Sequence, residues 1–186
     1  SKIADSGRIL FVEGKDKAYL SEIAFKVRPS AYDRFIALPT FSIKGFNNWP
    51  RAALTSEAFN EASSGRIKST MILDRDYRSA DSLAAVVAEA EKSALNVIIW
   101  QRKEIENYLL VPTAILRALS SESGSEISLE DINELLADAV AELVPDLEGQ
   151  IAEAARSADR GLSIPQALKI AREVIAERKG AGASDM

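Results

Sequence analysis

Two aspartates placed two residues apart, Asp74 and Asp76, directly follow a short apolar run at 71–73. In an extended backbone, residues i and i+2 project to the same side, so the two carboxylates would share one small volume. Two ionised carboxylates about 4 Å apart repel by roughly 4 kcal/mol at an effective dielectric constant of about 20. We therefore expect a shared proton, a basic partner or a metal ion to offset this repulsion.

The composition limits which chemistry is available. The 186 residues contain no cysteine and no histidine. This excludes disulfides, a Ser-His-Asp triad, a cysteine nucleophile and an ordinary zinc site. Carboxylate oxygens suit hard cations such as Mg²⁺ or Mn²⁺. The lack of cysteine, of a signal-peptide pattern and of a membrane-length apolar run predicts a cytoplasmic location with no membrane partner.

Short apolar runs alternate with helical patterns in the first part of the chain. Strands are expected at 8–12, 35–38, 70–74 and 97–100, and helices at about 16–27, at 50–62 and after Ser79. Apolar strands that alternate with helices predict an α/β fold, built on a parallel four-stranded sheet flanked by helices.

The pattern after Pro112 is helical only. Helices are expected at 113–119, 128–143, 151–158 and 163–175, with a polar loop at 120–125, a break or kink near Pro145 and Gly149, and a flexible tail at 180–184. This region is acidic: residues 111–186 carry 7 Lys/Arg against 14 Asp/Glu, whereas residues 1–110 carry 16 against 14. The expected organisation is an α/β domain over 1–111 and an all-helical appendage over 112–186.

Six acidic residues follow the ends of three expected strands. They are Glu13 and Asp16 after the first strand, Asp74 and Asp76 after the third, and Glu104 and Glu106 after the fourth. Open α/β sheets bind their ligands at the carboxyl ends of the strands. We therefore expect these acids to converge at one edge of the sheet, where they favour a hard metal ion over a shared proton.

Two motifs resemble the TOPRIM signature. They are Val12-Glu13-Gly14 at the end of the first strand and Asp74-Arg75-Asp76 about 60 residues later. TOPRIM is the catalytic domain shared by topoisomerases, bacterial primases, recombination-mediator proteins and nucleases of the OLD (overcoming lysogenization defect) family. The segment at 102–112 resembles the one after the fourth strand in OLD-like proteins, where TOPRIM follows an ABC-type ATPase domain. The resemblance covers roughly residues 8–116.

The resemblance implies a TOPRIM-like sheet, a role in phage defence and a divalent-metal site. It implies Glu13, Asp74 and Asp76 as ligands of Mg²⁺ or Mn²⁺, and Asp16, Glu104 and Glu106 as candidates for a second ion. Catalysis would rest on Glu13, Asp74, Asp76 and Glu106. ATP would act only through the ATPase domain, which is expected elsewhere in the same polypeptide.

The sequence departs from the family pattern at two places. The family usually has a second acid four residues after the first-strand Glu, but this position holds Lys17, and Asp16 comes one residue earlier. The OLD-like families also have a late Gly-Lys pair whose lysine assists catalysis. Lys179-Gly180 reverses that order, so we expect the catalytic lysine beyond this sequence.

Basic residues near the expected sheet edge are candidates for contacts with DNA phosphates. They are Lys44, Arg51, Arg75, Arg78, Arg102 and Lys103. Phe46 and Trp49, in the loop after the second strand, are candidates either for stacking on bases or for packing beneath the loop.

Together these observations predict a metal-dependent DNA endonuclease or nicking module. The main alternative is a non-catalytic TOPRIM-like module that binds DNA or a partner and has a degenerate metal site. A phosphoacceptor domain modified on Asp74 is a third reading, disfavoured by the Glu-Gly pair and by the Glu-rich segment after the fourth strand. Plainer roles also stay open: Asp16 as a helix-start residue, Asp74 and Asp76 as partners of nearby arginines, and the acidic helices as a scaffold or homodimer surface.

Overall fold

A computed structural model describes residues 2–123 and 127–181 of the chain. These residues form two compact units, Ser1–Leu109 and Leu110–Met186. The sequence predicted a division after residue 111, with the catalytic role in the first part; that assignment of roles stays a prediction. The polar loop expected at 120–125 and the tail expected at 180–184 are wrong over 120–123 and 180–181, which are helical, and their other residues lie outside the described part of the chain.

The first unit is built on a four-stranded, all-parallel sheet with strand order β2-β1-β3-β4. The strands are β1 (Arg8–Val12), β2 (Thr40–Ser42), β3 (Lys68–Leu73) and β4 (Leu95–Ile99). A short N-terminal helix, α1 (Lys2–Ser6), precedes β1. With the helices described below, this confirms the expected α/β fold class: a parallel four-stranded sheet in a TOPRIM-like layout, followed by a helical region.

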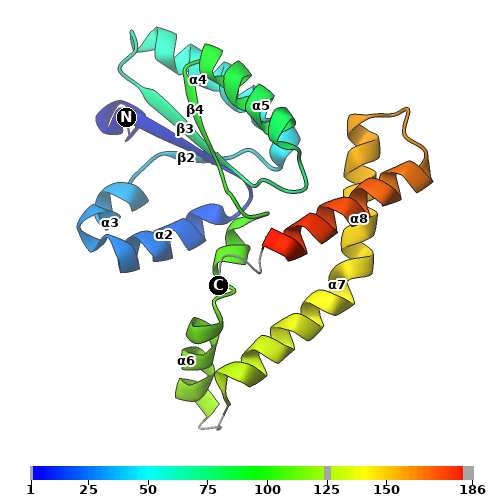
Figure 1. Ribbon diagram of the computed structural model, residues 1–186. Coiled ribbons are helices and arrows are strands. Elements are labelled where there is room, and N and C mark those ends of the chain that lie inside the picture. Colours follow the sequence, from blue (N-terminus) through cyan, green and yellow to red (C-terminus); the bar gives the residue numbers. More distant parts are fainter. Residues whose placement is uncertain (1, 124–126, 182–186) are drawn as a thin grey trace. The chain divides into compact units, whose positions relative to one another are not determined.

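Helices cover both faces of the sheet (Figure 1). On one face, α4 (Trp49–Ala62) and α5 (Ala80–Lys92) pack on alternate strand residues such as Phe11 and Leu73. On the other face, Leu20 of α2 (Asp16–Val27) and Phe35 of α3 (Pro29–Ile36) pack against Leu10, Val12 and Ile72. The parallel strands are therefore apolar on both faces, which explains their nearly continuous hydrophobic runs.

The expected strand at 35–38 is wrong. Phe35 and Ile36 are the last residues of α3, and β2 begins four residues later, at Thr40. Pro29 occupies the first turn of α3 and favours a helix there. The amide N–H that proline lacks would have no hydrogen-bond partner within the helix at this position. Four apolar residues in a row fit a strand or a helical turn equally well, so their pattern alone could not decide.

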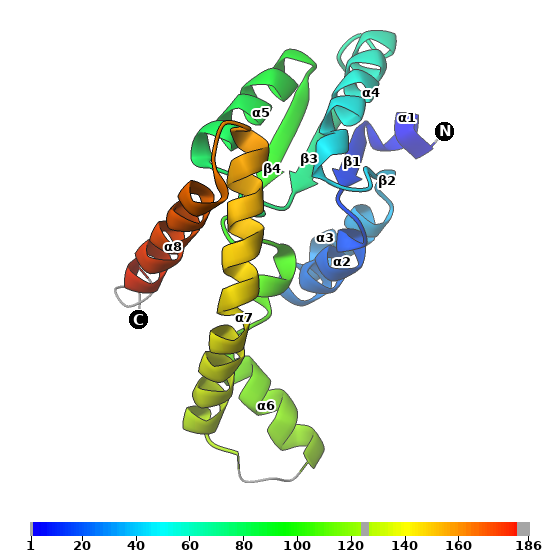
Figure 2. The same cartoon turned by 90° about the vertical axis from the view of Figure 1, so that its right-hand side faces the viewer.

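The second unit contains α6 (Pro112–Ser123), α7 (Leu129–Ala158) and α8 (Ile164–Ala181), seen from two sides in Figures 1 and 2. Ser128 starts α7 with a capping box to Asp131, as expected. Of the break or kink expected near Pro145 and Gly149, the break is wrong, because α7 continues through both residues. Pro145 is exposed, so water can solvate the carbonyl that the proline ring leaves without its helical partner.

Several large apolar side chains of α7 are exposed, among them Leu135, Val140 and Leu143. The expectation of a homodimer surface on these acidic helices stays a prediction. In the described part of the chain, no helix combines the length and apolar character that crossing a membrane requires.

Candidate active site at the carboxyl edge of the sheet

The register of the strands brings the ends of β1, β3 and β4 to nearly the same level. Val12 pairs with Ile72, and Leu73 pairs with Ile99. Glu13 and Asp74 therefore leave neighbouring strands within about one residue of each other, at the edge where α/β sheets bind ligands. The order β2-β1-β3-β4 sets β1 and β3 side by side in the middle of the sheet.

Asp74 lies at the centre of the acidic cluster. Burial raises its pKa to about 7, and repulsion from Asp16, Glu13, Asp76 and Glu104 adds to the effect. Four carboxylates from three separate segments thus act on one aspartate. The structure brings together residues that the sequence separates by up to 91 positions, from Glu13 to Glu104.

Asp76 is close to Asp74, but not because the strand continues. The strand β3 ends at Leu73, and Asp76 has a left-handed backbone with φ of 50°. The extended backbone expected at Asp76 is therefore wrong, although the two carboxylates lie close enough for Asp76 to raise the pKa of Asp74. Non-glycine residues in this conformation cost about 1–3 kcal/mol and cluster at functional sites. The Asp76 amide donates to the Lys103 carbonyl at 3.0 Å, which holds the turn against the segment after β4.

Asp16 belongs to the same cluster. It starts α2, yet it is only 7% exposed. Burial, followed by repulsion from Glu106 and Glu13, raises its pKa to about 6. The next residue, Lys17, makes different contacts, since its Nζ donates to the carbonyls of Ile36 and Leu38 at 3.3 and 3.0 Å. Asp16 therefore faces the acids, whereas Lys17 ties α2 to the connection between α3 and β2.

Opposing effects act on the pKa of Glu13. Burial and repulsion from Asp76 raise its pKa, while the backbone amides of Asp74 and Phe46 and the charge of Arg78 oppose that rise. Gly45, with φ of 101°, lets the loop pass close to this carboxylate: a Cβ atom there would lie 3.9 Å from Glu13 Oε1. The loop at 45–48, whose Phe46 the sequence suggested for base stacking or for packing, is thus also part of the acidic site.

The two glutamates after β4 have different surroundings. Glu104 forms a capping box with Asn107 at the start of the short helix η2 (Ile105–Tyr108), and its Oε1 accepts from Lys103 Nζ at 3.1 Å. Glu106 is exposed, and its charge raises the pKa of Asp16. The Glu104 carboxylate is therefore already bonded to the start of η2 and to Lys103, whereas Glu106 lies near Asp16.

Three carboxylate oxygens in this cluster are buried without a hydrogen-bond partner: Glu13 Oε2, Asp16 Oδ2 and Asp74 Oδ1. A buried polar oxygen without a partner costs about 1–3 kcal/mol, so native proteins rarely keep several together. Carboxylates are the ligands that Mg²⁺ and Mn²⁺ prefer, and the donor set therefore fits such an ion. In the conformation described for residues 2–123 and 127–181, no three acidic side chains are already arranged to hold one.

The six basic candidates differ in how tightly they are held. Arg75 and Arg102 donate to the carbonyls of Gln101 and Asn107, and Lys103 pairs with Glu104. Arg78 stacks on Phe46 and donates to Asn47. Lys44, in the loop after β2, and Arg51, in the first turn of α4, are exposed.

The aromatic pair proposed for base stacking is not equally available. Phe46 is 6% exposed and lies beneath the Arg78 guanidinium, so it packs under the loop. Trp49 is half-buried and packs against the core beneath α4 and α5. The structure therefore favours the packing role that the sequence left open for both side chains.

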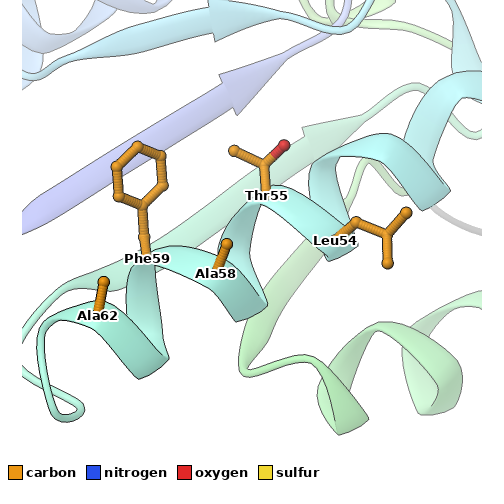
Figure 3. Close-up of a pocket in the computed structure, with 5 residues that line it drawn as sticks. All are labelled: Leu54, Thr55, Ala58, Phe59 and Ala62. Carbon is orange, nitrogen blue, oxygen red and sulfur yellow. The ribbon is translucent and has the colours of Figure 1, made fainter.

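A separate shallow hollow runs along α4 (Figure 3). It is lined by Leu54, Thr55, Ala58, Phe59 and Ala62. These five side chains include no ionisable group, so the hollow offers neither metal ligands nor an acid or base.

Comparisons with models of protein families, with curated proteins and with solved structures each returned no match.

Proposed function

We propose that this chain is a Mg²⁺- or Mn²⁺-dependent phosphodiesterase module that cleaves or nicks DNA. The observation that carries the proposal is the set of three buried carboxylate oxygens without hydrogen-bond partners, on Glu13, Asp16 and Asp74. Such a set is costly in a folded protein unless a cation or a proton compensates it. The resemblance to OLD-like nucleases supports a place beside an ABC-type ATPase domain of the same polypeptide.

Glu13, Asp74 and Asp76 would hold the first ion. Asp16 and Glu106 are the better candidates for a second ion, because the Glu104 carboxylate already caps η2 and forms an ion pair with Lys103. When bound, divalent ions of this kind neutralise phosphoryl oxygens and make a bound water more nucleophilic. The basic side chains around the cluster would bind and orient the DNA backbone.

The direct test uses supercoiled plasmid DNA with Mg²⁺ or Mn²⁺ and follows the appearance of nicked circles. Calorimetric titration with Mn²⁺ measures metal binding independently of cleavage. Asp74→Ala should abolish both signals, whereas Asp33→Asn, an exposed acid on α3, should leave both unchanged. Cleavage that survives Asp74→Ala would show that the proposed site is not responsible.

The non-catalytic alternative also has an observation in its favour. Lys17 stands where the family usually has its second acid, and Glu104 is partly occupied by Lys103. A protein with too few free carboxylates would bind DNA or a partner without cutting. Undetectable Mn²⁺ binding in the calorimeter, together with retained DNA binding, would favour this alternative.

A further inference from the structure

Two contacts hold the Arg78 side chain near the acidic cluster. Its guanidinium carbon lies 3.7 Å from the centroid of the Phe46 ring, and Nη2 donates to Asn47 Oδ1 at 3.1 Å. Phe46 is almost fully buried, so the ring is a fixed platform. A planar guanidinium stacked on an aromatic face and bonded at one edge has little freedom to move.

The loop at 45–48 positions both Glu13 and Arg78. The Phe46 amide favours the ionised form of Glu13, and the Phe46 ring carries Arg78. The charge of Arg78 also favours ionised Glu13. Phe46 therefore positions the Arg78 guanidinium and the Glu13 carboxylate relative to each other. Arg78 lies two residues after Asp76 in the chain.

Arg78 keeps its charge and some of its donors available. Across residues 2–123 and 127–181, no carboxylate oxygen forms an ion pair with it within 4.0 Å. Its Nε is buried without a hydrogen-bond partner, so a phosphate oxygen would meet the outer Nη atoms, of which Nη2 also donates to Asn47. Lys103 differs, because its ammonium is paired with Glu104 at 3.1 Å.

We propose that Arg78, held on the Phe46 ring, is a fixed clamp for a phosphodiester group of the DNA backbone beside the acidic cluster. This inference rests on the proposed function. Six carboxylates repel a polyanion, so the substrate needs a nearby cation that the acids do not fully neutralise. A guanidinium matches phosphate oxygens with parallel N–H donors, and its fixed position lowers the entropic cost of binding.

The test measures binding of a fluorescein-labelled DNA duplex by fluorescence anisotropy, with EDTA and separately with Mn²⁺, between about 50 and 200 mM salt. Arg78→Gln should weaken binding about tenfold and reduce the slope of log K against log salt by about one, as expected for one lost phosphate contact. Arg78→Lys should keep the slope but bind less tightly, since an ammonium does not reproduce the planar fork. Phe46→Leu should weaken binding by about threefold, because it removes the platform but keeps the charge.

The matched control is Arg8→Gln, which makes the same charge change at the exposed first residue of β1, at the opposite end of the strands. Its affinity should stay within about twofold and its salt slope should not change. If Arg78→Gln and Arg8→Gln are indistinguishable while DNA still binds, the clamp is refuted and the proposed function is untouched. If the unaltered chain binds no DNA under either condition, both proposals fall.

Discussion

The backbone amide of Asp76 donates to the carbonyl of Lys103 at 3.0 Å. This bond joins the turn after β3 to the segment after β4, which are 27 residues apart in the chain. Asp76 makes this bond from a left-handed backbone, with φ of 50°. The contact holds Asp74 and Asp76 on one side and Glu104 on the other, so the acidic cluster depends on backbone geometry as well as on its carboxylates.

Two substitutions of Asp76 should separate its backbone role from its charge. Asparagine tolerates a left-handed backbone better than alanine, so Asp76→Ala should unfold more easily than Asp76→Asn by about 1 kcal/mol. Both variants lack the carboxylate and should lose cleavage equally. Urea denaturation compares the two stabilities at one pH, and equal stabilities would argue against the backbone role.

The metal-free protein should become less stable as the pH rises. The pKa of Asp74 is raised to about 7 and that of Asp16 to about 6, so the folded state binds these protons more tightly than the unfolded chain. Stability from these groups is fully present below the ordinary aspartate pKa of 3.8 and is lost progressively as the pH rises to about 6 and about 7. Urea midpoints in EDTA at about pH 5.5 and 8 measure the loss. An Asp16→Asn/Asp74→Asn double variant should show a shallower dependence; an unchanged one contradicts the assignment.

Removing the charge of Asp74 should stabilise the metal-free fold and abolish metal binding at the acidic cluster. At about pH 8, Asp74→Asn should raise the free energy of unfolding by about 1–3 kcal/mol, after allowance for solvent screening. Mn²⁺ binding should be lost in the same variant, a common trade between stability and function. Asp33→Asn, exposed on α3, is the control and should change neither quantity. A destabilised Asp74→Asn protein would mean that Asp74 makes contacts that stabilise the fold.

An acid at position 17 should not improve metal binding. Lys17→Glu places an acid four residues after Glu13, the spacing usual in TOPRIM domains, but Lys17 donates to the carbonyls of Ile36 and Leu38 and is turned to that connection. We expect a loss of about 1–2 kcal/mol of stability and no gain in Mn²⁺ affinity by calorimetry. Asp16→Asn should instead weaken Mn²⁺ binding without a loss of stability. A Lys17→Glu protein that binds Mn²⁺ more tightly would reverse this assignment.

The two glutamates after β4 should respond differently to neutralisation. Glu104→Gln loses its ion pair with Lys103 and weakens the cap of η2, so it should cost about 0.5–1 kcal/mol of stability. Glu106→Gln should leave stability nearly unchanged but reduce Mn²⁺ binding and cleavage. Thermal unfolding and calorimetry distinguish the two effects. Equal metal binding by Glu106→Gln and the unaltered protein would exclude Glu106 as a ligand.

Much of the fold could be predicted because its signals are local. The apolar runs of β1, β3 and β4 were found to within two residues at each end, and the capping box of Ser128 marked the start of α7. The failures were also local. The run at 35–38 fits a helix or a strand, and Pro145 predicts a break only where the lost hydrogen bond is not solvated.

The sequence by itself determined the available chemistry: without His or Cys, the residues at this edge can act only through carboxylates, basic side chains and hydroxyls, with any ion that they bind. It also determined that acids follow three strands. Only the tertiary structure decided that Asp16 rather than Lys17 joins them, and that Phe46 supports Arg78. The physical reason is that a side chain's surroundings depend on packing between distant segments and on single backbone angles, such as those of Asp76 and Gly45, which residue spacing does not encode.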